Sequence, residues 1–145
     1  MRCIMRAPVE VGVDLVSIQQ MAAMLTAGGA GFRELCWTAD ELVYCGSSTS
    51  RLAVRWAAKE AAMKALGRGI GDIDPTEIEV IALEGHRPTL RLHGSALALA
   101  QEQGVDLALS MSHEDDFAVA FVVATPRLPS ECGRCQQEGE TVGTE

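Results

Sequence analysis

The sequence predicts an α+β fold in which an antiparallel sheet packs around a central buried helix. The helix is the alanine-rich segment 51–66, which is apolar on two sides and is therefore expected to be enclosed by other elements. The sheet is predicted from apolar and β-branched runs at 9–16, 78–83, 89–92, 105–112 and 117–124. With 145 residues and 48% hydrophobic content, the chain can form one domain with a core.

The first strand, 9–16, carries an acidic residue inside an apolar run. Alternation places Asp14 on the face opposite to four apolar side chains. These are Val9, Val11, Val13 and Leu15. Helical spacing begins at about Ser17, so either capping of that helix or ligand binding explains an acid at Asp14, and the two roles are compatible.

Two short helices are expected before the central one. The first begins at about Ser17 and is broken by the glycines in 27–31. The second is expected over 32–45 and contains a capping box, in which Thr38 is followed three residues later by Glu41.

The central helix follows a loop at 46–50, whose hydroxyl side chains are good caps, and it ends at Gly67 and Gly69. Glu60 and Lys64 lie one turn apart at the edge of its alanine face. They form either an ordinary i,i+4 surface pair or a group of charges that serves chemistry. The helix alone does not choose between these interpretations.

Three basic residues of the same helix, Arg51, Arg55 and Lys59, recur every four positions. Like charges at this spacing repel each other unless an anion or a carboxylate lies beside them. The pattern therefore indicates either a solvated basic stripe or an anion site, and spacing leaves both open.

The second half of the chain reads as a hairpin, an amphipathic helix and two further strands. The hairpin pairs 78–83 with 89–92, the helix spans 95–103, and the turn 113–116 joins the strands 105–112 and 117–124. His113 directly follows a strand end, where a histidine can be structural or catalytic. From Pro126 onward the composition predicts a disordered tail, which gives a folded domain over 1–125 and a tail over 126–145.

Composition excludes several functional classes. The formal net charge of −8 argues against a nucleic-acid-binding module. No run is long enough to span a membrane and the N-terminus lacks an apolar signal core, so we expect a cytoplasmic protein with no membrane partner. Cys132 and Cys135 have the spacing of half a zinc site, but the sequence contains no second such pair, so no zinc site is predicted.

Three segments, 11–18, 55–67 and 109–113, resemble one family in order and in spacing. It is the holo-acyl-carrier-protein synthases, the short 4′-phosphopantetheinyl transferases, and the resemblance covers 9–124. Such an enzyme moves 4′-phosphopantetheine from coenzyme A to a serine hydroxyl of an apo acyl carrier protein and releases adenosine 3′,5′-bisphosphate. The resemblance implies the fold of this family, Mg²⁺ as cofactor, and a homotrimer with active sites between subunits.

The resemblance also implies roles for individual residues. Asp14 and Glu60 would bind Mg²⁺, and Lys64 would neutralise the charge of the pyrophosphate. Either Glu60 or a water molecule at the metal would accept the serine proton. The residues implied to bind coenzyme A are Arg55, Lys59, Gly67, Gly69, Pro88, Ser112 and His113.

The sequence departs from the family pattern at the surface expected to meet the carrier. The first helix lacks the usual basic residues, and Gln19 and Gln20 occupy places where one is expected. Arg68 and His86 replace a usual threonine and glycine. A fatty-acid and a polyketide carrier both remain open. Two alternatives follow: a coenzyme A or nucleotide-binding protein with altered carrier recognition, and a structural trimer in which Glu60 and Lys64 are only a helix pair.

Overall fold

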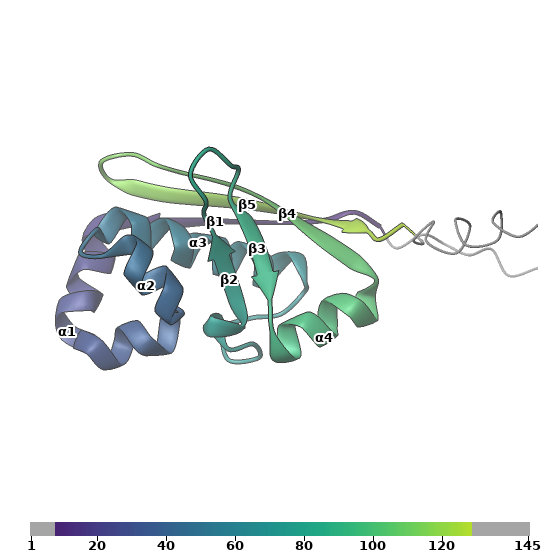
Figure 1. Ribbon diagram of the computed structural model, residues 1–145, viewed down its shortest axis with the longest axis horizontal. Helices are drawn as coiled ribbons and strands as arrows, with labels where there is room; N and C mark the ends of the chain where they lie inside the picture. Colours follow the sequence, from purple (N-terminus) through teal and green to yellow (C-terminus); the bar gives the residue numbers. More distant parts are fainter. Residues whose placement is uncertain (1–7, 129–145) are drawn as a thin grey trace, which may run out of the picture.

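The computed structural model describes residues 8–128, in which antiparallel strands and helices form an α+β fold (Figure 1). The elements in order are β1 (Glu10–Ser17), α1 (Ile18–Cys36), α2 (Ala39–Cys45), α3 (Thr49–Ala65), the short 3₁₀ helix η1 (Pro75–Glu77), β2 (Ile78–Ile81), β3 (Thr89–Leu92), α4 (Gly94–Gln103), β4 (Val105–His113) and β5 (Phe117–Pro126).

The strands form two separate antiparallel sheets. The larger has the order β1-β5-β4, so the first strand of the chain pairs with the last, and the smaller is the β2–β3 hairpin. Asp14 lies opposite Ala120, and Ser112 lies opposite Val119, in this register. The predicted α+β class and the antiparallel pairing are confirmed, although the strands do not join into one sheet.

Helix α3 is the centre of the core, as its two apolar sides predict. It lies under the larger sheet in Figure 1, and its alanines are almost completely buried, among them Ala57, Ala61 and Ala65. The small side chains let β1 approach closely, because a Cβ atom added at Gly12 would lie only 1.9 Å from the Ala61 carbonyl oxygen. This contact joins the strand that carries Asp14 to the helix that carries Glu60.

Hydrogen bonds define both ends of α3. The Ser48 side chain accepts from the Arg51 N–H at the first turn. At the other end, the Gly67 N–H donates to the Lys64 carbonyl and the Arg68 N–H donates to the Met63 carbonyl. This is the pattern of a Schellman motif, so the predicted glycine end is confirmed.

The predicted glycine break is confirmed, whereas the predicted second helix is wrong. Gly29 has the non-helical angles φ 59° and ψ −149°, so α1 consists of two helical stretches joined at a kink. The predicted helix over 32–45 is divided, because α1 ends at Cys36 and α2 begins after Thr38. The physical reason is the capping box itself: Thr38 Oγ1 accepts from the Glu41 N–H, and Glu41 Oε1 accepts from the Thr38 N–H, which starts a new helix.

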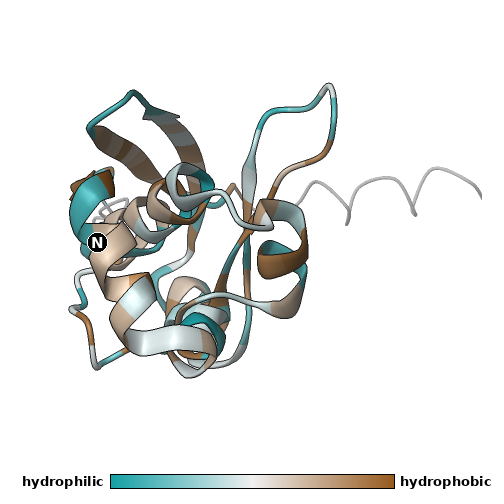
Figure 2. Cartoon of the chain, turned by 90° about the vertical axis from the view of Figure 1, so that its left-hand side faces the viewer, coloured by the Kyte–Doolittle hydropathy of each residue, from teal (hydrophilic) through white to brown (hydrophobic). Residues whose placement is uncertain are grey.

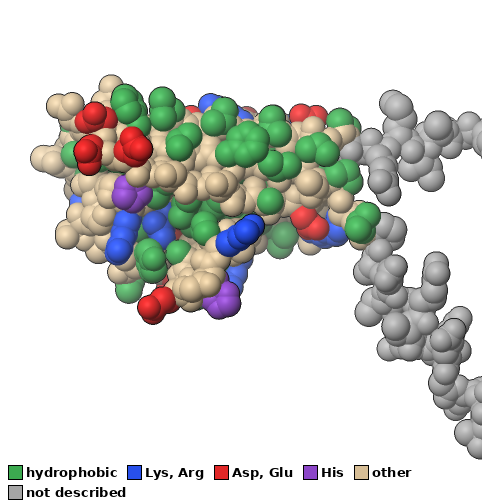
Figure 3. Space-filling view, turned by 90° about the horizontal axis from the view of Figure 1, so that it is seen from above, with side chains coloured by type: hydrophobic (Ala, Val, Ile, Leu, Met, Phe, Trp, Pro, Cys, Tyr) green, Lys and Arg blue, Asp and Glu red, His purple; other side chains and the backbone are tan. Residues whose placement is uncertain are grey.

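The outer face of the larger sheet is apolar. Hydrophobic side chains of β1, of β5 and of Val9, which precedes β1, lie at least one-third exposed there, and the space-filling view in Figure 3 shows hydrophobic groups along this face. They are Val9, Val11, Val13, Leu15, Phe117, Val119 and Phe121. Figure 2 likewise shows hydrophobic strands joined by hydrophilic turns. A sheet with apolar side chains on both faces is suited to contact with another surface.

The last described residues extend the sheet beyond the expected end of the domain. Strand β5 reaches Pro126, and Arg127 Nη2 lies 2.9 Å from Asp106 Oδ1. Ordered structure therefore continues into the range assigned to the tail. The rest of that range, with Cys132 and Cys135, lies outside the described residues. Within 8–128, none of the helices combines the length and the apolar character that crossing a membrane requires.

Candidate active site

Asp14 supplies the first carboxylate of the candidate site. Its Oδ1 accepts a hydrogen bond from Lys64 Nζ at 3.1 Å, whereas its Oδ2 is buried and has no hydrogen-bond partner. The cap of α1 is Ser17, whose hydroxyl oxygen accepts from the Gln20 N–H at 3.2 Å, so Asp14 does not have the capping role. A buried carboxylate oxygen without a partner is costly, which makes Asp14 a candidate ligand.

Glu60 supplies the second carboxylate, from the face of α3 that meets β1. Its side chain is half-buried, and its pKa is raised to about 8. Burial is the largest cause of this shift and the neighbouring Asp14 carboxylate is the next, while Lys64 and Trp56 act in the opposite direction. Two facing carboxyl groups of which one retains its proton near neutral pH can accept a cation between them.

The chemistry of this pair fits Mg²⁺. Within residues 8–128, no group of three or more His, Cys, Asp or Glu side chains is placed to hold a metal ion. Magnesium usually takes one or two protein carboxylates and completes its octahedron with water and substrate phosphate oxygens. Asp14 Oδ2, which is buried without a partner, and Glu60 are the oxygens that would hold it.

Lys64 lies beside the two carboxylates but does not form the expected helix pair. Its Nζ donates to the Val13 carbonyl at 2.9 Å and to Asp14 Oδ1, so it joins α3 to β1. Among the described residues, its ion-pair partner is Asp14 and not Glu60. The interpretation of Glu60 and Lys64 as an ordinary i,i+4 ion pair is therefore wrong. The Lys64 side chain is 56% exposed, so an anionic ligand can approach it from solvent.

Lys59 requires a correction, because the structure buries it completely. Its Nζ donates to Glu41 Oε1 at 2.6 Å, to the Pro75 carbonyl at 2.9 Å and to the Ile78 carbonyl at 2.6 Å. These three acceptors use all the protons of an ammonium group. Burial lowers the pKa of Lys59, and the Glu41 carboxylate opposes that shift. Lys59 is thus a structural residue that a bound coenzyme does not reach.

Four of the residues expected to bind coenzyme line one pocket of about 320 Å³: Arg55, Pro88, Ser112 and His113. They come from α3, from the chain that connects β2 to β3, and from the end of β4. Arg55 is only 3% exposed, its Nη1 donates to the Arg51 carbonyl, and its Cζ lies 4.6 Å from the centre of the Tyr44 ring. Arg55 and Lys59 are buried whereas Arg51 is exposed, so the three basic residues of α3 do not form a single solvated stripe.

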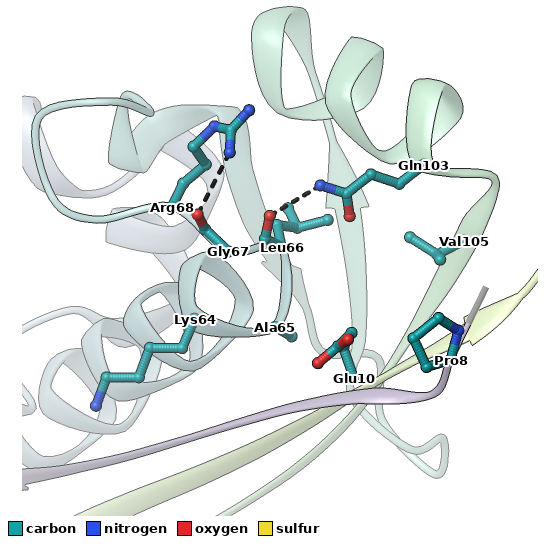
Figure 4. A pocket seen from close by; sticks show the side chains of 9 residues that line it. All are labelled: Pro8, Glu10, Lys64, Ala65, Leu66, Gly67, Arg68, Gln103 and Val105. Atoms are coloured by element: carbon teal, nitrogen blue, oxygen red, sulfur yellow. Dashed lines mark hydrogen bonds between the residues drawn. The ribbon is translucent and has the colours of Figure 1, made fainter.

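Gly67 lines a different pocket of about 490 Å³ at the end of α3 (Figure 4). There the Arg68 side chain folds back toward the Gly67 carbonyl, and Gln103 of α4 donates to the Leu66 carbonyl at 2.9 Å. The Lys64 side chain extends away from these groups. The lining of this pocket thus includes the glycine end of α3, the basic residues Lys64 and Arg68, and the acidic residue Glu10.

The residues implied to bind coenzyme consequently fall into two regions. Arg55 and Gly67 are separated by about 18 Å along α3. Arg55 and Glu60, five positions apart, project about 140° from each other around the helix axis. Gly69 lines neither pocket, and its N–H donates to Asp72 Oδ2 at 3.3 Å. One subunit does not gather all of these residues around a single cavity.

Comparison with known proteins identifies the family. The family model described as the 4′-phosphopantetheinyl transferase superfamily matches residues 10–122. The chain belongs to this superfamily. Holo-acyl-carrier-protein synthase of Herpetosiphon aurantiacus is 42% identical over 120 residues, which are 77% of this chain and 94% of the relative. The chain is therefore an enzyme of the holo-acyl-carrier-protein synthase type, as the three matched segments indicated.

Solved structures of phosphopantetheinyl transferases have the same fold. The Helicobacter pylori holo-acyl-carrier-protein synthase, in complex with coenzyme A, has a TM-score of 0.72 and 29% identity, and covers 79% of this chain and 99% of its own. The Chronobacterium ammoniagenes enzyme, also in complex with coenzyme A, has a TM-score of 0.71 and 34% identity, with coverage of 83% and 99%. The expected fold of the family is thereby confirmed.

The sequence did not predict the structural roles of two residues of this phosphopantetheinyl transferase. Glu41 was recognised as part of a capping box, but its ion pair with Lys59 joins positions 18 residues apart and leaves no periodic signal. Tyr44 holds Arg51 and Arg55 over its ring, at 5.4 Å and 4.6 Å from the ring centre. No local pattern indicates that contact, because a loop separates Tyr44 from α3.

Proposed function

We propose that the chain transfers 4′-phosphopantetheine from coenzyme A to a serine hydroxyl of an apo acyl carrier protein, with Mg²⁺ as cofactor and adenosine 3′,5′-bisphosphate as the released product. The observation that carries this proposal is the meeting of Asp14 and Glu60 beside Lys64, with Asp14 Oδ2 buried and unpartnered. Two carboxylates and one accessible ammonium group suit a reaction at a pyrophosphate.

The side chains divide the chemical work. The serine oxygen attacks the β-phosphorus, a bond forms between them, and the bond from that phosphorus to the bridging oxygen breaks. The bridging oxygen leaves with its electron pair on adenosine 3′,5′-bisphosphate. Bound Mg²⁺ would supply charge neutralisation at the pyrophosphate. Lys64 turns its exposed ammonium group toward the leaving phosphate, and Glu60, or a water molecule that it orients, accepts the serine proton.

The separation of the coenzyme residues supports a site between subunits of a homotrimer. Arg55 and Glu60 project in different directions from α3, so one subunit would supply Asp14, Glu60 and Lys64 while its neighbour supplies the Arg55 pocket. The apolar outer face of the larger sheet supports association, because its exposed residues would be buried by another copy.

The test of the reaction is a mass measurement. The full chain is incubated with coenzyme A, Mg²⁺ and an apo carrier, and we expect the carrier to gain the mass of one phosphopantetheine. Glu60→Gln should abolish this gain. Asp14→Asn should lower it and change its dependence on Mg²⁺, because the amide carries no charge and is a weaker ligand than a carboxylate. Absence of any adduct with fatty-acid and polyketide carriers would overturn the proposal.

The test of the shared site is complementation between two inactive variants. Glu60→Gln and Arg55→Ala subunits are produced separately and together. If each site uses Glu60 of one subunit and Arg55 of the next, the mixed assembly regains part of the wild-type activity. A mixture as inactive as its components would show that one subunit supplies both residues. Light scattering on the wild type gives the number of subunits directly.

A second function, coenzyme A binding with altered carrier recognition, is favoured by the composition of α1. Its stretch 18–32 contains no charged residue, and Met24 is 45% exposed on it. Binding of coenzyme A without transfer to any carrier would support this alternative. The cytoplasmic location expected from the sequence stays a prediction.

A further inference from the structure

Helix α1 exposes a face that carries no charge. The stretch 18–32 contains no Asp, Glu, Lys or Arg. Met21 and Leu25 are buried against the core, whereas the side chains that project away from the core are exposed. A surface helix normally places charged groups on its outer side, so this composition is unusual. The exposed face, which we call the α1 face, consists of Gln20, Ala23, Met24 and Ala27.

The α1 face begins beside the two carboxylates of the candidate site. Asp14 lies in β1, and α1 begins at Ile18, four positions later. Along the chain, Asp14 and Met24 are at most about 22 Å apart. A stable protein interface covers about 800 Å² on each partner, which is a patch about 30 Å across. A protein that brings its serine to this site therefore also reaches the α1 face.

Association through the larger sheet leaves the α1 face accessible. In Figure 1, α1 lies below the larger sheet, on the same side as α3. Its buried residue Met21 packs in one cluster with Leu52 of α3 and Ala118 of β5. The next residue of β5, Val119, belongs to the apolar outer face on the other side of the sheet. A copy bound to the outer face would thus not cover the α1 face.

The turn next to the start of α1 is acidic. The Ile18 N–H donates to the Asp116 carbonyl at 3.0 Å, which joins the turn between β4 and β5 to the first residue of the helix. Glu114, Asp115 and Asp116 of this turn are all exposed. Lys64 beside Asp14 is already engaged in an ion pair with it. Because like charges across an interface repel each other, this surface disfavours an acidic partner.

We propose that the α1 face and the turn 114–116 form the docking surface for the carrier protein, and that this surface selects a carrier whose residues around the modified serine are apolar and uncharged or basic, not acidic. This inference rests on the proposed function for the reaction. Met24, which is 45% exposed, supplies apolar area, and the short side chains of Ala23 and Ala27 let a helix of the partner pack closely.

The test separates binding from transfer by means of an unreactive carrier. The probe is an acyl carrier protein whose modified serine is replaced by alanine. One version has acidic residues on the helix that follows the serine, and in the other version these residues are replaced by the corresponding amides. Calorimetry on the full chain should show about tenfold tighter binding of the amide version at low salt. The difference should shrink at high salt, which screens the repulsion.

Variants of α1 show whether the α1 face makes the contact. Met24→Glu adds a charge to it and should weaken binding of the amide version about fivefold or more. Val43→Glu is the matched control, because Val43 is an apolar residue of α2 that is 84% exposed and lies outside the proposed surface. Gln20→Arg should tighten binding of the acidic version, since it supplies the cation that the α1 face lacks.

Equal binding of the two versions, tighter binding of the acidic version, or an unchanged affinity in Met24→Glu would overturn the inference. A change in the number of subunits in Met24→Glu, measured by light scattering, would also overturn it, because the α1 face would then belong to a contact between copies. Transfer from coenzyme A to the serine forms of both carriers is assayed in parallel. Preferential binding without transfer counts against the proposed function, and transfer without the preference counts against the docking surface alone.

Discussion

Helix α3 carries two lysines five positions apart that have opposite environments. Lys59 is fully buried, and its ammonium group donates to one carboxylate and two backbone carbonyls. Lys64 is 56% exposed and donates to two oxygen atoms of β1. The helix therefore uses the same residue type once to hold the fold together and once to serve the site.

The difference shows how the surroundings of a charge decide its use. Glu41 accepts hydrogen bonds from Lys59, from the Thr38 N–H and from the Val80 N–H, so both members of the buried ion pair have the partners that offset their desolvation. Near Lys64, Asp14 Oδ2 has no partner, and the pKa of Glu60 is raised to about 8. The buried ion pair of Lys59 and Glu41 thus has hydrogen-bond partners for its charged atoms, whereas the carboxylates beside Lys64 include an oxygen atom without a partner.

Replacement of the buried lysine should have the largest effect. Lys59→Met leaves Glu41 buried without its ion-pair partner, so we expect the free energy of unfolding to fall by about 3–5 kcal/mol. Urea unfolding measures this loss. The double variant Lys59→Met/Glu41→Gln removes both charges, keeps an oxygen acceptor for a backbone N–H, and should recover part of this loss. A single variant that loses less than about 1 kcal/mol would refute the structural role.

Replacement of the exposed lysine should lower the activity and leave the stability almost unchanged. Lys64→Met removes the cation proposed to act on the leaving phosphate, and we expect kcat/KM for coenzyme A to fall by about 10²–10³-fold. The free energy of unfolding should change by less than about 0.5 kcal/mol, because the ion pair with Asp14 is exposed on the lysine side. If Lys64→Met unfolds as easily as Lys59→Met, the contrast between the two lysines is wrong.

Separating β1 from α3 should damage both regions together. A methyl group at Gly12 would meet the Ala61 carbonyl at 1.9 Å, so Gly12→Ala must displace the strand from the helix. We expect a destabilisation of about 1–3 kcal/mol and a loss of transfer activity, because Asp14 moves with the strand. Gly31→Ala is the control, since no atom lies within 4 Å of a Cβ atom there. Equal stability of the two variants would contradict the close approach.

The pH dependence of stability should be the smallest effect. Because the pKa of Glu60 rises from an ordinary value of 4.5 to about 8, the metal-free fold favours the protonated carboxyl group. Below both values the proton is present in both states; as the pH rises, the unfolded chain loses it first and the fold is penalised. We expect a loss of about 1 kcal/mol between pH 5 and 8, reduced by the partial exposure of Glu60. Urea unfolding in a chelator should show this slope, and Glu60→Gln should remove it.

Local sequence patterns predicted the individual helices and hairpins better than the contacts between elements that are distant in the sequence. The glycine end of α3, its alanine faces and both hairpins follow from spacing and turn residues that lie close together in the sequence. The interpretation that paired Lys64 with Glu60 was wrong because helical periodicity identifies only neighbours on the same helix. Asp14 belongs to β1, which lies next to α3 through the contact between Gly12 and Ala61.

The candidate site was predictable to the extent that three separated segments matched one family in order. That match brought Asp14, Glu60 and Lys64 into one hypothesis before any geometry was known, and the structure places them together. Lys59 was misplaced because its burial depends on Glu41, which belongs to another helix. The position of His86 in the Arg55 pocket depends on how the β2–β3 connection folds over α3, which no local pattern contains.

The alternation of β1 has a consequence for how the length of this protein can change. Successive side chains of the strand face α3 and the outer apolar surface in turn, so inserting or deleting one residue before Asp14 would exchange the two sets. The carboxylate would then lie among Val119 and Phe121 on the outer face, and an apolar side chain, Val13 or Leu15, would replace it beside Glu60. Single-residue length changes are thus excluded in β1, and chains of this family should vary in length elsewhere, as in the turn around His86.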